Sequence, residues 1–153
     1  MKKTSVTLVL AFTFLLAFAS VAIAQTAEKG WEKTVTLPSG EEILDMSGEW
    51  DDHGEFYGPF SQFQPMSDIL TITQEGATFT AVKQIGSKWV PKGAETLKGE
   101  LGKDGFKAVY YYIGALSMDG SFEWEECEWK ISEDGNKVKI DCGERVRSTL
   151  TRK

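Results

Sequence analysis

Two cysteines are the most informative reactive side chains in this sequence. Cys127 and Cys142 are the only cysteines among its 153 residues, and they stand at mirror-image positions about the turn signal 133–136. The Asp-Gly dipeptide within that signal suits the positive φ angles of a tight hairpin turn. The pairs created by folding the chain there are Cys127–Cys142, Trp129–Ile140 and Ile131–Val138. The sequence therefore predicts a disulfide across two adjacent strands and leaves no thiolate nucleophile.

The geometry of that disulfide depends on the turn. With a two-residue turn, the cysteines occupy a hydrogen-bonded pair of positions, where Cα atoms lie about 5.5 Å apart and side chains diverge. A bulge or a slipped register would then bring the sulfur atoms together.

Acid–base chemistry has one candidate, the run Asp51-Asp52-His53-Gly54. Its carboxylates and imidazole could bind a cation or transfer a proton. However, polar residues directly after a strand are typical of a solvated turn. His53 is the only histidine, which excludes a histidine-rich zinc site. We therefore predict no catalytic residue, no metal site and no cofactor.

Aromatic side chains form the better candidate site, and four of the eight that we select lie in a long connection predicted over 51–67. Loops of this length are usually functional or disordered, and four aromatics give this one apolar surface to bury. We interpret it as a lid across the mouth of a barrel. The alternative is an Ω-loop that packs only its own side chains over the barrel end.

The other aromatics come from strands and from a loop over 86–93. Tyr110 and Tyr112 alternate with Tyr111, so they lie on the opposite strand face from it. Such side chains line a ligand pocket or fill the barrel interior; both interpretations stay open. The predicted ligand-binding residues are Phe56, Tyr57, Phe60, Phe63, Trp89, Tyr110, Tyr112 and Trp124.

The elements that position these residues are β-strands, because alternating segments separated by Gly, Asp and Asn recur without helical periodicity. One hairpin joins 70–73 to 79–81 through Glu75-Gly76, a second joins 97–101 to 106–112, and the third carries the cysteines. Segments at 47–50 and 146–152 complete eight strands. Closure removes exposed edges, so we predict an all-β, eight-stranded antiparallel up-and-down barrel, with a β-sandwich as the alternative.

Gly48-Glu49-Trp50 on the first predicted barrel strand, with Arg152 near the end of the last, resembles the calycin group of lipocalins and avidin-like small barrels. In those families the tryptophan closes one end of the barrel and a basic residue packs over it. The resemblance implies structural roles for Trp50 and Arg152, with Arg145 and Arg147 as alternatives. A guanidinium on an indole face is worth roughly 0.5 to 2 kcal/mol.

The N-terminus has the order of a secretory signal: Lys2-Lys3, an apolar run over 6–23, and small residues before a cut expected after Ala24. The rival interpretation is a membrane anchor, since the run approaches the length of a spanning helix. We predict a signal peptide over 1–24, an N-terminal arm over 25–45 and one barrel domain over 46–153. The protein would be secreted or periplasmic, where a disulfide persists.

Charge restricts the partners. Loss of Lys2 and Lys3 would move the net charge from −6 to about −8, which disfavours nucleic acid and, after signal cleavage, a membrane surface as binding partners.

The leading functional hypothesis is an exported protein that holds a small apolar or aromatic molecule in its barrel. The second is a protein-interaction module, for example a protease inhibitor acting through 25–45; certain periplasmic inhibitors are similar in being disulfide-bonded barrels with an N-terminal arm. The third is an isomerase or cyclase with Tyr110, Tyr112 or Asp51 as proton donors.

Overall fold

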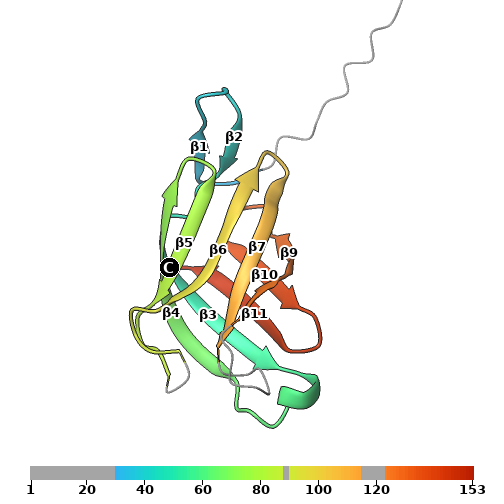
Figure 1. The fold of residues 1–153 in the computed structure, drawn as a ribbon. Helices are drawn as coiled ribbons and strands as arrows, with labels where there is room; N and C mark the ends of the chain where they lie inside the picture. The colour runs from blue at the N-terminus through green and yellow to red at the C-terminus, as the bar shows by residue number, and fades with distance from the viewer. Residues whose placement is uncertain (1–29, 88–89, 115–122) are drawn as a thin grey trace, which may run out of the picture.

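A computed structural model describes residues 30–87, 90–114 and 123–153, and in these the chain is all-β apart from one short 3-10 turn (Figure 1). The predicted signal peptide lies outside the described residues. The elements in order are β1 (Thr34–Thr36), β2 (Glu42–Leu44), β3 (Gly48–Phe56), η1 (Gly58–Phe60), β4 (Met66–Glu75), β5 (Thr78–Lys83), β6 (Glu95–Gly102), β7 (Gly105–Gly114), β8 (Glu123–Glu126), β9 (Glu128–Ile131), β10 (Lys137–Cys142) and β11 (Val146–Arg152). Across these ranges, the chain forms no helix long and apolar enough to cross a membrane.

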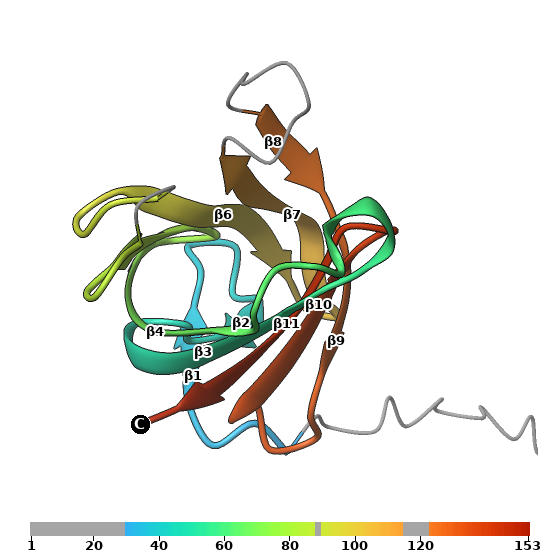
Figure 2. The same ribbon diagram turned by 90° about the horizontal axis from the view of Figure 1, so that it is seen from below.

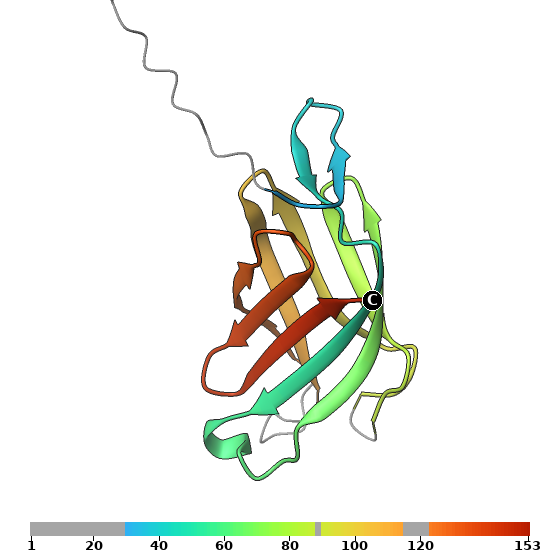
Figure 3. The ribbon, with the colours of Figure 1, turned by 180° about the vertical axis from the view of Figure 1, so that it is seen from behind.

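Nine strands form one antiparallel sheet in the order β8-β7-β6-β5-β4-β3-β11-β10-β9. The two edge strands, β8 and β9, are separated in sequence only by Cys127, so one continuous segment borders both edges of the sheet. The rings of Phe106 in β7 and Trp129 in β9 lie 5.4 Å apart across this seam. The sheet is thus nearly closed into a barrel, which confirms the predicted fold; Figures 1 and 3 show its two sides. The predicted strand that carries Cys127, the sixth in chain order, is divided at that residue into β8 and β9, which gives nine strands.

The cysteine hairpin has the predicted register, with Ile131 opposite Val138 and Trp129 opposite Ile140. The Cys127–Cys142 disulfide is present, with Cα atoms 4.4 Å apart. The turn is a four-residue loop closed by the Ser132 N–H, which donates to the Lys137 carbonyl at 2.9 Å. The longer loop places the cysteines at a non-hydrogen-bonded pair, where about 4.5 Å is usual. No bulge or slip is needed between them.

The first hairpin differs from its prediction by two residues. The predicted turn at Glu75-Gly76 would place Ile72 opposite Phe79, but Ile72 lies opposite Ala81. The turn is made by Gly76 and Ala77, because Gly76 supplies the positive φ (58°) that the first turn position requires. The faces of the strands are unchanged, since a shift of two keeps every side chain on its side.

The second hairpin contains a bulge that reverses one prediction. Leu101 pairs with Phe106, but Glu100 pairs with Ala108, so Lys107 is an extra residue in β7. Beyond the bulge, the alternation is inverted. Val109 and Tyr111 are buried, so the prediction that Tyr110 and Tyr112 face the barrel interior is wrong.

The connection predicted over 51–67 is shorter, because β3 continues to Phe56 and β4 begins at Met66. Asp51 and His53 are exposed on the outer face, whereas Asp52 is buried. The interpretation of 51–54 as a solvated turn is therefore wrong. A buried aspartate at an inward position concealed the alternation of this strand.

Residues 30–46 fill one end of the barrel. β1 and β2 form a hairpin at that end, and Figure 2 shows it through the barrel from the opposite end. Ile43, Leu44 and Met46 are fully buried, and Trp31 packs against the core. The segment predicted as an arm is thus, over its described part, packed against the barrel.

Trp50 and Arg152 meet at this same closed end. Trp50 is fully buried and its indole N–H donates to the Met46 carbonyl at 2.8 Å. The guanidinium carbon of Arg152 lies 4.3 Å from the centre of the Trp50 ring, and the guanidinium donates to the carbonyls of Ser47 and Asp45. Arg152 therefore connects β11, the last strand, by hydrogen bonds to residues 45–47, which lead into β3.

We expect Arg152→Ala to lower the free energy of unfolding by about 1 to 3 kcal/mol, because charge-assisted hydrogen bonds and the indole contact are lost together. Denaturant titration followed by Trp fluorescence measures this. Arg147→Ala, which removes an exposed guanidinium, is the matched control and should have a much smaller effect. Equal effects of the two substitutions would contradict the role given to Arg152.

Candidate functional site

Six polar side chains from six strands lie inside the barrel, between its apolar core and the open rim that carries η1. We call them the polar layer. All are at least 95% buried. Its members are Asp52 (β3), Asp68 (β4), Lys83 (β5), Thr96 (β6), Tyr111 (β7) and Ser148 (β11).

Strand alternation directs these side chains inward. Asp52 stands two residues beyond buried Trp50, Asp68 two residues before buried Leu70, and Lys83 two beyond Ala81. Each of these three charged residues therefore continues an apolar inward-facing row toward the rim. Burying charges in this way is costly, and apolar residues of similar volume would often be as stable.

Asp52 is the centre of the layer. Its carboxylate accepts hydrogen bonds from the Tyr111 hydroxyl at 3.1 Å and from the Ser148 hydroxyl, and the Lys83 ammonium lies 4.0 Å away. Burial raises the pKa of Asp52 above 3.8, although these neighbours oppose the rise. Burial also raises the pKa of Tyr111 well above 10, so the phenol stays neutral and acts as a donor.

Asp68 has a different environment, because its carboxylate accepts four backbone N–H groups. These belong to Ile69 at 2.7 Å, Gln84 at 3.2 Å, Ile85 at 3.0 Å and Gly86 at 2.8 Å. Burial alone would raise the pKa of Asp68, but these N–H groups and Lys83 lower it below 3.8. Asp68 thus remains ionised and holds the start of the β5–β6 connection.

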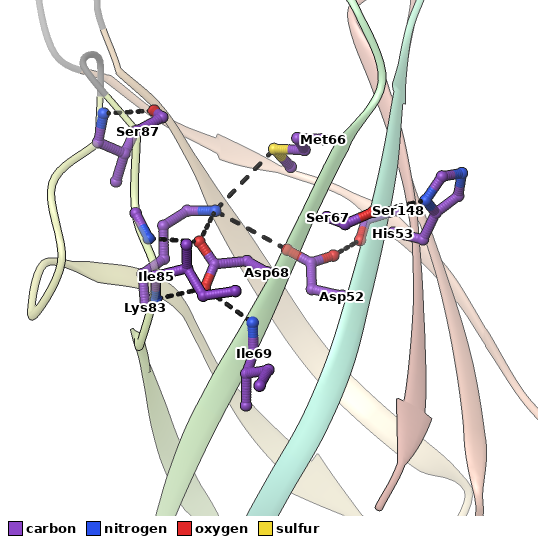
Figure 4. A network of polar contacts seen from close by, with 12 residues as sticks. Asp52, His53, Met66, Ser67, Asp68, Ile69, Lys83, Ile85, Ser87 and Ser148 are labelled. Atoms are coloured by element: carbon purple, nitrogen blue, oxygen red, sulfur yellow. Dashed lines mark hydrogen bonds and ion pairs between the residues drawn. The ribbon is translucent and has the colours of Figure 1, made fainter.

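The polar and sulfur atoms around the Lys83 ammonium lie 3.4 Å or more from its nitrogen (Figure 4). Its Nζ lies 3.4 Å from Asp68 Oδ2, 3.9 Å from Met66 Sδ and 4.0 Å from Asp52 Oδ2. A thioether is a weak acceptor, and charge-assisted N–H···O bonds are usually 2.7–2.9 Å long. The ammonium is therefore incompletely hydrogen-bonded among the described residues.

The rim above the layer carries part of the predicted aromatic set. Phe63 packs on Phe56 and Phe60, with ring centres 5.8 and 6.2 Å apart. Phe56 also packs against the core. The Tyr57 N–H donates to the Arg145 carbonyl at 2.9 Å, so the 57–65 connection is fixed beside the β10–β11 turn at the rim.

The remaining predicted residues lie on the outer surface or outside the described chain. Tyr112 and Trp124 pack against each other on the outer face of β7 and β8, with Lys98 over Trp124, and half-buried Tyr110 shares that face. The Tyr57 ring contacts Arg147 in an outer groove. Trp89 lies outside the described residues. Ligand binding by the eight residues stays a prediction.

That outer groove has a volume of about 390 Å³ and crosses β3, β11, β10 and β9. Its walls combine both signs of charge, including Glu55, Asp141, Lys139 and Arg147. Arg147 Nε donates to Asp141 at 2.7 Å and Tyr57 donates to Glu55 at 2.5 Å. These groups satisfy one another, so the groove presents no concentrated charge to a ligand.

Within the described ranges, no group of three or more His, Cys, Asp or Glu side chains is placed to hold a metal ion. Comparison with known proteins finds no matching family model, no similar curated protein and no similar solved structure. The proposed function therefore rests on the polar layer.

The sequence analysis named Asp52 only within a run interpreted as a solvated turn, and it selected Tyr110 and Tyr112 for the site. In the structure Asp52 and Tyr111 face the interior. The signal that could have found them is the alternation Trp50-x-Asp52-x-Gly54, which continues the strand inward past the aspartate. For Tyr111, the bulge at Lys107 left no such signal.

Proposed function

We propose that this protein is an exported carrier that binds a small apolar or aromatic molecule inside the barrel, at the rim end next to the polar layer. The observation that carries the proposal is the polar layer itself: two carboxylates, an ammonium and a phenol converge inside a barrel whose other end is filled by residues 30–46. Titratable groups brought together and perturbed in this way are concentrated at functional sites.

Two further features support this location. At the rim, the Phe63 ring contacts the rings of Phe56 and Phe60. These three rings would provide apolar contact to a ligand that enters there. Export is supported by the disulfide, which persists in oxidising compartments, and by the predicted signal peptide.

Binding of the neutral fluorophore N-phenyl-1-naphthylamine tests the proposal. We expect saturable binding that is weakened about fivefold to tenfold in Phe60→Ala/Phe63→Ala, because removal of apolar contact costs about 1 kcal/mol or more. Leu37→Ala, an apolar truncation between β1 and β2 at the closed end, should leave the affinity unchanged. Absence of binding, or equal affinity of the rim variant and the wild type, would contradict the proposal. Native mass spectrometry of protein from its own host would identify a co-purifying ligand.

A protein-interaction module is the second candidate. The β1–β2 hairpin projects from the closed end, and Pro38, Ser39 and Gly40 at its tip are exposed (Figure 3). An inhibitor would use this tip, so replacement of these three residues should abolish capture of the target protein. The isomerase hypothesis has less support, because Asp51 is exposed and Tyr110 shares the outer face.

A further inference from the structure

The polar layer has spare hydrogen-bond donors and no spare carboxylate oxygen. Both oxygens of Asp52 accept hydroxyl donors, and both oxygens of Asp68 accept backbone N–H groups. The Lys83 ammonium, in contrast, lies 3.4 Å from one Asp68 oxygen, 3.9 Å from a thioether and 4.0 Å from one Asp52 oxygen, all farther than an ordinary charge-assisted hydrogen bond. The donor side of the layer is the one left incomplete.

Thr96 provides an independent observation of the same kind. Its side chain is fully buried, and its hydroxyl lies near the Tyr111 phenol but makes no hydrogen bond of ordinary geometry with the residues that the structure describes. Thr96 occupies a register shift between β5 and β6, next to Leu97, which pairs with Tyr111. An unpaired buried hydroxyl is costly, so a group that hydrogen-bonds it would stabilise the site.

Charge restricts what the missing partner is. Asp52 and Asp68 face the single cation Lys83, so the layer carries at most one surplus negative charge, and Glu125 at the rim is offset by Arg145 at 3.6 Å. A carboxylate ligand would add a second unpaired negative charge in a region shielded from water. An ammonium ligand would need a free acceptor inside the layer, and each carboxylate oxygen of Asp52 and Asp68 already accepts a hydrogen bond. The one buried carboxylate oxygen without a hydrogen bond among the described residues, Glu125 Oε2, lies outside the layer and faces the Arg145 guanidinium.

A neutral oxygen acceptor adds no negative charge to the layer and needs only a hydrogen-bond donor, which Lys83 can supply. Met66 occupies the place next to Lys83 with a flexible side chain: it packs against Gly54, where a Cβ atom would lie 2.5 Å from the Met66 methyl carbon. A carbonyl oxygen that replaces the thioether would give Lys83 a stronger acceptor without changing the charge of the layer.

We infer that the ligand of the proposed carrier is an apolar or aromatic carbonyl compound, and that its carbonyl oxygen accepts a hydrogen bond from Lys83. This inference rests on the proposed function, since it names the ligand class of the same site. Lys83 supplies the charged donor, while the aromatic residues at the rim contact the apolar part.

Four naphthalene compounds of one skeleton test the ligand class: 2-acetylnaphthalene, 2-ethylnaphthalene, 2-naphthoate and 1-(2-naphthyl)ethylamine. We expect the acetyl compound to bind most tightly, by about tenfold or more over the ethyl compound, which is the usual value of a hydrogen bond to a charged group. Equal affinity of these two would overturn the carbonyl inference and leave the carrier function standing. Tightest binding of the naphthoate or the amine would also overturn it, whereas no binding of any compound would count against the carrier function.

Variants test the role of Lys83. Lys83→Met should remove the preference for 2-acetylnaphthalene over 2-ethylnaphthalene, and circular dichroism reports whether the variant folds. If Lys83→Met does not fold, Lys83→Met/Asp52→Asn keeps the net charge of the layer at its original value and should show the same loss of preference. A preference that persists in the folded variant would overturn the inference. Thr96→Val, which is nearly isosteric, measures the contribution of the second donor.

Discussion

Replacement of Lys83 by methionine is expected to lower the free energy of unfolding at pH 7 by about 3 to 5 kcal/mol, because it leaves two buried carboxylates without their shared cation. The side chains of Lys83 and Asp52 are at most 4% exposed, so solvent does not replace the lost partner. Circular dichroism or Trp fluorescence in a urea titration measures the change. Lys107→Met is the matched control: its ammonium pairs with Glu100 at 2.9 Å on the surface, and its loss should have little effect.

The loss of stability in Lys83→Met should depend on pH, in a direction set by the pKa of Asp52. Burial already raises the pKa of Asp52 in the folded protein above 3.8, and removal of Lys83 raises it further, because Lys83 lowers it. The folded variant therefore binds this proton more tightly than the unfolded chain does. The penalty is fully present above the folded pKa and is relieved as the pH falls toward 3.8. The difference between wild type and variant should shrink from pH 7 to pH 4.

Asp68 acts in the opposite sense. Its pKa is lowered in the folded protein, so it contributes stability above 3.8 that is lost as the pH falls through its folded pKa. Loss of Lys83 removes part of this contribution. Asp52→Asn in the Lys83→Met background isolates Asp52, and it should recover most of the lost stability at pH 7. A double variant no more stable than Lys83→Met, or a deficit that grows toward pH 4, would contradict the role given to the Asp52–Lys83 contact.

The all-β class, the strand segments and the disulfide were predictable because each depends on local alternation and on one symmetric hairpin. The N-terminal hairpin β1–β2 was missed, because its strands are only three residues long and its stability depends on Ile43 and Leu44 packing against a barrel end. A contact formed only in the assembled fold leaves no local pattern.

The candidate site was harder to predict because it violates the pattern used to find strands. Inward positions are expected to be apolar, so Asp52 and Lys83 were assigned no interior place. The faces of β7 were inverted by one extra residue, Lys107, since a single insertion exchanges the two sides of a strand. Tyr110 and Tyr112 were therefore predicted for the interior that Tyr111 occupies.

Removal of the disulfide should give the second large loss of folding stability, because the bond lies at the seam where the two edges of the sheet meet. Cys127 separates the two edge strands, and its N–H donates to the Val109 carbonyl of β7 at 2.9 Å while its sulfur is bonded to Cys142 of β10. The bond therefore attaches the segment that borders both edges to the strand beside it. On the chain-entropy model, a loop of this length stabilises the folded state by roughly 3 kcal/mol.

We expect Cys127→Ala/Cys142→Ala to lower the free energy of unfolding by about 3 kcal/mol, and reduction of the wild type to have a similar effect. Hydrogen exchange should accelerate in β8 and β9, at the seam, more than in the β3–β4 hairpin, which is held by backbone hydrogen bonds remote from the disulfide. The preference among the naphthalene compounds should persist, because the polar layer contains neither cysteine. Equal stability under oxidising and reducing conditions would show that the barrel closes without the covalent bond, and a uniform rise in exchange would show that its effect is not localised at the seam.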